Sequence, residues 1–154
     1  MSLPLRRAAL LASLLLASAA MPAHAEHVRY SVVANGEKVG FVDADEQGGK
    51  VAIVYDVKNN GRGPTMREEI ALGRDGLPVR WTLEGKSLFG AEVQERFALE
   101  GGAARWTDAM GEKQQARAAG KLYVGQNASP WALGLYARAL LKDADGRIAA
   151  LPGG

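Results

Sequence analysis

The sequence contains no cysteine and only two histidines, His24 and His27, among its 154 residues. The lack of cysteine excludes a disulfide framework, zinc–thiolate sites and thiol nucleophiles. Two histidines are too few for a metal centre built from several imidazoles, and Ser129 lies in no Gly-x-Ser-x-Gly elbow. We therefore predict no catalytic residue, no metal ligand and no bound cofactor, and we expect His27 to be a solvent-exposed residue near a chain terminus.

An excess of charge of one sign is also missing. Lys and Arg number 19 and Asp and Glu number 17, and without Arg6 and Arg7 the two signs balance at 17 each. A balanced surface offers no basic patch to nucleic acid or to an anionic membrane. Nucleic acid is therefore excluded as the expected partner.

The one long apolar stretch lies at the start of the chain. Arg6 and Arg7 precede the Ala- and Leu-rich residues 8–20, and small residues, Ala23 and Ala25, follow. This pattern is typical of a secretory signal peptide spanning residues 1–25, cleaved before Glu26. No later segment approaches the ~20 apolar residues of a membrane-spanning helix, so we expect no transmembrane anchor after signal cleavage. The prediction is an exported protein, periplasmic or extracellular.

After Glu26, apolar residues recur at every second position. Val51, Ile53, Tyr55 and Val57 show this alternation clearly, which indicates strands with one apolar and one wet face. Similar segments follow one another about every 10 to 14 residues, separated by Gly, Asn and Asp, as in an antiparallel meander. The Asn35-Gly36 pair predicts a type I′ hairpin turn.

A single helix is expected near the end of the chain, over about residues 130–142. Ser129 would cap it and Pro130 would occupy its first position. An apolar stripe would then face the sheet, because a helix this short is not stable alone in water. The stripe comprises Trp131, Leu135 and Ala139, widened by Leu133, Tyr136, Ala137, Leu140 and Leu141.

The predicted fold is therefore mainly β (α+β), a curved antiparallel sheet or half-barrel meander closed by one C-terminal helix and preceded by a signal-peptide helix. We expect one domain over residues 26–146. The composition of residues 147–154 predicts a truncated linker. In it the apolar residues Ile148 to Leu151 are followed by Pro152-Gly153-Gly154.

Two groups of polar residues are candidate sites. Residues 59–64 form a Gly-rich loop in which Arg62 and main-chain N–H groups could hold an anion, but the Lys-Ser/Thr of a phosphate-binding loop does not follow, so a tight hairpin is favoured.

Four glutamates could supply a carboxylate pair, and two of them, Glu68 and Glu95, fall at inward strand positions. A buried acid can be a functional group with a shifted pKa, yet no second catalytic group accompanies it, which favours a structural role. The four are Glu68, Glu69, Glu92 and Glu95.

Apolar side chains on the inner faces could line a pocket for an apolar ligand. Aromatic residues at such positions more often form plain core, and both interpretations stay open at this point. The candidate pocket or core residues are Tyr30, Tyr55, Trp81, Phe97, Trp106, Trp131 and Leu135.

The order and spacing of several segments resemble a known family, over essentially the whole chain after Glu26. The segments are Tyr30-Ser31-Val32-Val33 with Asn35-Gly36-Glu37-Lys38-Val39-Gly40; Lys58-Asn59-Asn60-Gly61-Arg62-Gly63-Pro64; Ser87-Leu88-Phe89-Gly90 with Glu95-Arg96-Phe97; and Ser129-Pro130 with the helix to Leu141. Together they resemble the N-terminal, non-catalytic, β-rich region of exported bacterial proteins of the amidohydrolase superfamily. In such proteins a metal-binding barrel with paired histidines follows, and none of its motifs is present here.

Two functions remain as expectations. The resemblance implies an accessory module, without catalytic residues, of a metal-dependent hydrolase acting on C–N bonds, with a downstream catalytic barrel domain as its partner in cis or in trans. A looser likeness, to small periplasmic proteins with a curved sheet and a helix, implies a stand-alone binder of an apolar, lipid-like small molecule or of a protein.

Overall fold

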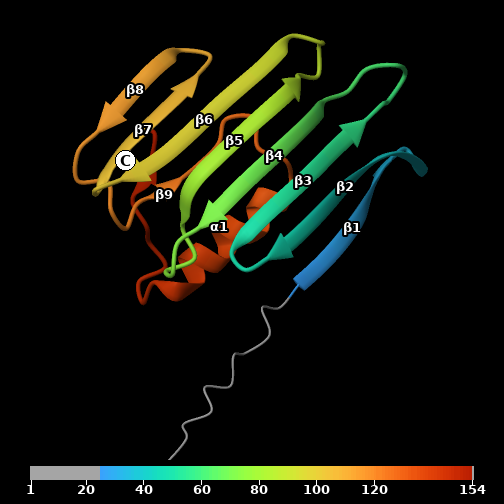
Figure 1. Cartoon of the computed structure of the whole chain (residues 1–154). Coiled ribbons are helices and arrows are strands. Elements are labelled where there is room, and N and C mark those ends of the chain that lie inside the picture. Colours follow the sequence, from blue (N-terminus) through green and yellow to red (C-terminus); the bar gives the residue numbers. More distant parts are fainter. Residues whose placement is uncertain (1–24, 154) are drawn as a thin grey trace, which may run out of the picture.

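The computed structural model describes residues 25–153, and within them the chain forms one large antiparallel sheet covered by one helix (Figure 1). The sheet strands follow one another in space in the order in which they occur along the chain. They are β1 (Ala25–Ala34), β2 (Glu37–Gln47), β3 (Lys50–Val57), β4 (Thr65–Leu72), β5 (Pro78–Lys86), β6 (Glu92–Glu100), β7 (Ala103–Asp108) and β8 (Gly111–Gln115). The predicted mainly β, antiparallel meander with a C-terminal helix is confirmed.

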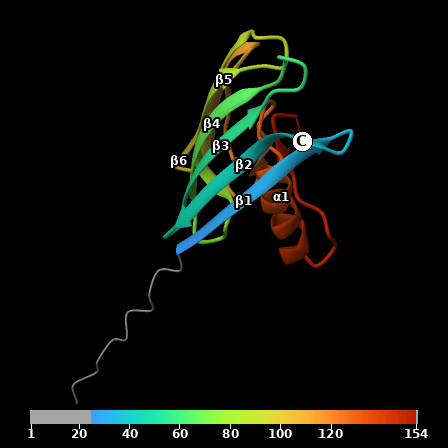
Figure 2. The same cartoon turned by 90° about the vertical axis from the view of Figure 1, so that its right-hand side faces the viewer.

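The sheet is open, because its first and last strands, β1 and β8, pair only with β2 and β7. The chain after β8 returns across one face of the sheet, and Figure 2 shows helix α1 (Trp131–Lys142) on that side. Two short strands, β9 (Leu122–Tyr123) and β10 (Ala150–Leu151), pair in parallel within this returning segment. All but the last residue of the predicted signal peptide lies outside the described residues. Among those described, no helix is long and apolar enough to cross a membrane.

The first hairpin turn follows the sequence prediction. Asn35 and Gly36 have φ angles of 53° and 82°, as both central positions of a type I′ turn require. Asn60 and Gly61 repeat this conformation, with φ angles of 52° and 75°, between β3 and β4. Only glycine adopts such angles freely, although asparagine tolerates them better than most residues.

Strand alternation separates a buried face from an exposed one. A row of inner residues runs across five neighbouring strands and all its members are buried. The row is Ala44, Ile53, Glu68, Leu83 and Glu95, paired in that order. The outer row beside it begins with Asp45, Ala52 and Glu69, all of them exposed, so the described part of the chain covers the sheet on the helix side alone.

The helix buries a narrower face than the sequence predicted. Ala132, Leu135 and Ala139 are its buried residues. Leu133 and Leu141, predicted to widen this face, are 67% and 85% exposed. They lie outside the contact because one sheet can cover only about one stripe of a helix.

The predicted cap of this helix was also wrong. The helix begins at Trp131, Pro130 precedes it, and no side chain caps its first turn. Ser129 takes part through its main chain instead: its carbonyl accepts a hydrogen bond of 3.0 Å from the N–H of Ala132. Its own N–H is directed at a buried glutamate, so that the position of Ser129 is fixed by the sheet.

The segment that the sequence suggested to be a linker packs on the domain over part of its length. Leu151 is completely buried, and Ile148 packs against Leu77, Leu122 and Ala139. The N–H groups of Leu122 and Val124 donate to the carbonyls of Ala149 and Leu151. These contacts attach residues 148–151 to the domain.

Leu135 provides a direct test of helix docking, since it is only 1% exposed. Leu135→Ala should lower the free energy of unfolding by about 2–5 kcal/mol, the usual cost of truncating a buried leucine. Leu133→Ala, on the outward side of the same helix, is the matched control and should change it by less than about 0.5 kcal/mol. Urea denaturation of both variants measures the difference. Equal effects would mean that the helix is not docked through Leu135.

Candidate functional site

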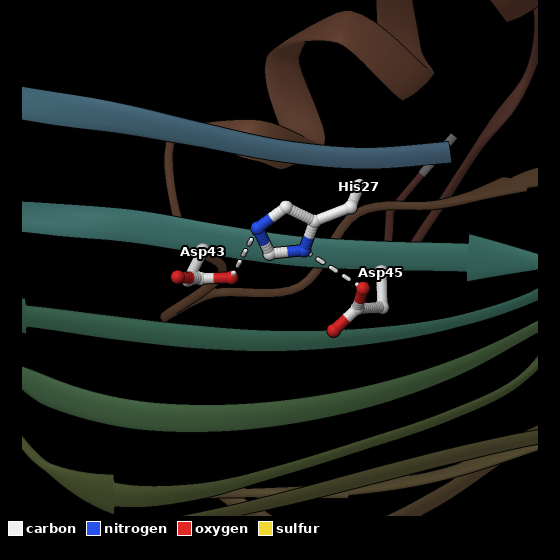
Figure 3. A group of neighbouring side chains, drawn as sticks. All are labelled: His27, Asp43 and Asp45. Atoms are coloured by element: carbon white, nitrogen blue, oxygen red, sulfur yellow. Dashed lines mark hydrogen bonds and ion pairs between the residues drawn. The ribbon is translucent and has the colours of Figure 1, made fainter. Parts of the chain in front are cut away.

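His27 lies between two aspartates on the exposed face of the sheet (Figure 3). It is directly opposite Asp45 in the pairing of β1 with β2, and its Nδ1 is 2.8 Å from Asp45 Oδ1. Its Nε2 is 3.6 Å from Asp43 Oδ1. The sequence correctly predicted that His27 is exposed, but it gave no sign of the aspartates, which are brought close by strand pairing.

Asp43 is the most buried member of this cluster, and Arg29 holds its second carboxylate oxygen. Arg29 Nη1 lies 2.5 Å from Asp43 Oδ2, and the guanidinium lies over the ring of Phe41 at 4.1 Å from its centroid. The Asp43 side chain is 18% exposed, whereas those of His27 and Asp45 are far more open to solvent. Arg29 therefore orients one carboxylate oxygen of Asp43 toward His27.

The second polar site is a pair of buried carboxylates on the covered face. Glu68 on β4 and Glu95 on β6 are 1% and 2% exposed, and both lie opposite Leu83 on the strand between them. Among residues 25–153, neither forms an ion pair. Carboxylates without a nearby cation must be stabilised by hydrogen-bond donors.

The segment before the helix supplies most of those donors. Glu68 accepts hydrogen bonds from Trp81 Nε1 at 3.0 Å and from the N–H of Ser129 at 2.6 Å. Glu95 accepts them from the Tyr123 hydroxyl at 2.6 Å and from the N–H of Gln126 at 2.9 Å. The two glutamates therefore hold residues 123–129 against the sheet and so fix the start of α1.

Burial dominates the electrostatics of Glu68. It raises the pKa of Glu68 above its ordinary value, and the charge of Glu95 adds to the effect, while the hydrogen bonds from Ser129 and Trp81 act in the opposite direction. Burial also raises the pKa of Tyr123, reinforced by its hydrogen bond to Glu95, and raises the pKa of Tyr136 to about 12. Both tyrosines therefore remain protonated throughout the physiological pH range; Tyr123 donates to Glu95, and the Tyr136 hydroxyl accepts from the N–H of Gly125.

The four candidate glutamates do not form one site. Glu69 and Glu92 are exposed, and Glu92 lies 3.6 Å from Lys86 in a surface ion pair. Sequence alternation correctly placed Glu68 and Glu95 inward. It could not identify their partners, because Ser129 is 61 residues from Glu68 along the chain.

The Gly-rich loop of residues 59–64 is a tight hairpin. The N–H of Asn59 donates to the carbonyl of Arg62 at 2.7 Å, and the N–H of Arg62 donates back to Asn59 at 3.0 Å. Gly63 is needed for packing, since a Cβ there would lie 2.0 Å from the carbonyl oxygen of Val57. The two N–H groups are therefore satisfied inside the turn and are not presented to an anion.

All but one of the residues considered for an apolar pocket belong to the core between sheet and helix or pack against it. Trp81, Phe97 and Trp106 are buried in the core, and Phe97 stacks on Tyr123 with ring centroids 4.2 Å apart. Of the remaining candidates, Leu135 is buried, Tyr55 and Trp131 are half-buried against the core, and Tyr30 is 57% exposed. These contacts favour core packing over a hollow interior.

An open groove of about 720 Å³ lies elsewhere, and none of the candidate pocket residues lines it. Its lining includes Asp45, Ala52 and Glu69 of the exposed outer row, together with Arg80 and Thr82. The groove therefore adjoins the His27 cluster through Asp45.

Comparison with known proteins adds no relative, since the chain matches no protein-family model, no curated protein and no solved structure.

The raised pKa of Glu68 predicts a pH dependence of stability. The folded protein holds this proton more tightly than the unfolded chain does, so stability falls as the pH rises from the ordinary value of 4.5 through the raised pKa. Glu68→Gln cannot ionise and should flatten this part of the profile. Glu69→Gln, the exposed neighbour on β4, should retain it. Urea unfolding at a series of pH values measures the slopes, and parallel profiles for wild type and Glu68→Gln would contradict the expectation.

Proposed function

We propose that this chain is an accessory β-module, without catalytic residues of its own, of an exported amidohydrolase-like hydrolase. The domain, taken as a half-barrel sheet around α1, would dock onto the metal-binding catalytic barrel, in cis or in trans, through the exposed side of α1. The resemblance of the sequence segments supports the identity of the partner. The main structural support for docking is the apolar side of α1, which faces away from the sheet.

That side of the helix is formed by three leucines. Leu133, Leu140 and Leu141 are 67%, 39% and 85% exposed. Their spacing places them on one side of a helix, opposite the buried Ala132, Leu135 and Ala139. Exposed large apolar side chains gathered on one side of a surface helix are typical of a protein–protein contact.

The polar groups support a non-catalytic role. Glu68 and Glu95 are engaged by donors from the core and from residues 123–129, which is the arrangement expected of carboxylates with a structural role. The filled interior likewise gives the stand-alone carrier of apolar ligands little support, because Phe97, Tyr123 and Trp81 occupy the space that such a ligand would need.

Binding to a barrel domain tests the proposal. The purified chain is mixed with the barrel domain of an exported amidohydrolase from which the corresponding N-terminal region has been deleted, and association is measured by sedimentation velocity. We expect a complex that the double variant Leu133→Asp/Leu141→Asp weakens by about tenfold or more, since it places charge in the core of an apolar contact. The same variant should abolish any weak self-association of the isolated chain.

Phe89→Asp is the matched control. Phe89 is 82% exposed and lies in the turn between β5 and β6, at the end of the sheet away from α1 (Figure 1). It should leave the complex intact. Two results together would contradict the proposal: a monomer that binds no barrel domain, and lipid that mass spectrometry detects after denaturation. They would favour the stand-alone binder of an apolar, lipid-like molecule.

A further inference from the structure

We propose that His27, Asp43 and Asp45 form a binding site for a divalent transition-metal ion of the Zn²⁺ type on the exposed face of the sheet. This site is separate from the docking surface on α1 and does not depend on the proposed function. The sequence gave no reason to expect it, because His27 has no ligand partner nearby along the chain.

Strand pairing supplies the three ligands from two neighbouring strands. One ring nitrogen of His27 and one carboxylate oxygen from each aspartate all lie within 4.8 Å of one another (Figure 3). Ligand atoms bound to one zinc ion at about 2.0 Å lie roughly 3 to 3.5 Å apart. In the structure Nδ1 faces Asp45 and Nε2 faces Asp43, so binding requires the side chains to rotate until one ring nitrogen faces both carboxylates. The backbone positions are set by the β1–β2 register, in which His27 is opposite Asp45.

Asp43 has the surroundings expected of a metal-binding carboxylate. Its Oδ2 is held by Arg29, which leaves Oδ1 facing His27. Outer contacts of this kind orient a ligand and reduce the freedom that it loses on binding. The positive charge of Arg29 leaves the group with a net charge of −1 when His27 is neutral, which still attracts a dication.

The donor set selects the class of metal. Mg²⁺ and Ca²⁺ prefer sites made only of oxygen ligands, whereas an imidazole together with carboxylates suits Zn²⁺ and related transition ions. Three protein ligands leave at least one coordination position for water. This position would lie on the solvent side, near the groove that Asp45 borders.

Calorimetric titration with zinc chloride tests the site on the full chain, prepared without a polyhistidine tag. We expect one zinc ion per chain, and a rise in melting temperature with zinc concentration. His27→Gln and Asp45→Asn should each weaken binding by about tenfold or more, since each removes one of three ligands. Magnesium chloride at the same concentrations should give no comparable heat.

Glu69→Gln is the matched control, because Glu69 is an exposed acid on the same face but outside the cluster. It should bind zinc within about twofold of wild type, and circular dichroism should show that all variants are folded. The proposal is overturned if wild type binds no zinc at millimolar concentration, or if His27→Gln binds it as tightly as wild type does.

Discussion

Two buried carboxylates, Glu68 and Glu95, form no ion pair within residues 25–153, and the arrangement of the covered face depends on the hydrogen bonds that satisfy them. Leaving Glu68 or Glu95 without donors would cost several kcal/mol, because a buried charge loses its hydration. The donors come from Trp81 and from the returning segment, through Tyr123, Gln126 and Ser129. These hydrogen bonds determine the path of residues 123–129. They hold Ser129, which lies just before α1, against Glu68 on the central strand β4.

This constraint explains why the start of the helix departs from the usual capping pattern. Ser129 would normally offer its hydroxyl to the first turn, but its main-chain N–H is bound to Glu68, and no side chain caps the helix. Packing of Leu135 and Ala139 then substitutes for the missing cap as the source of helix stability. The same orientation directs Leu133 and Leu141 away from the sheet, so the buried glutamates indirectly determine which leucines are available to a partner.

Local sequence patterns were sufficient to predict the strands of the sheet, but not the contacts that its covered face makes with the returning segment. Alternation identified the inward positions of Ile53, Glu68 and Leu83, and the Asn35-Gly36 turn was correct because its chemistry is contained in two residues. The partners of Glu68 and Glu95 lie 13 to 61 residues away, and no periodicity encodes such distances. The cluster of His27 with Asp43 and Asp45 was missed for a related reason: it depends on the register of β1 against β2, which a single sequence does not specify.

The position of β1 gives that cluster its significance. This strand is paired on one edge only, and Tyr30 is 57% exposed even though Val42, directly opposite on β2, is almost fully buried. Core packing on the covered face therefore holds β1 less firmly than it holds the central strands. Edge strands with little core packing separate from a sheet most easily by local unfolding. On the outer face, the contacts of His27 with Asp45 and of Arg29 with Asp43 join β1 to β2 near the start of the strand. An ion bound there would add a cross-link between an edge strand and its one neighbour, so its effect on local opening of β1 should exceed its effect on the core.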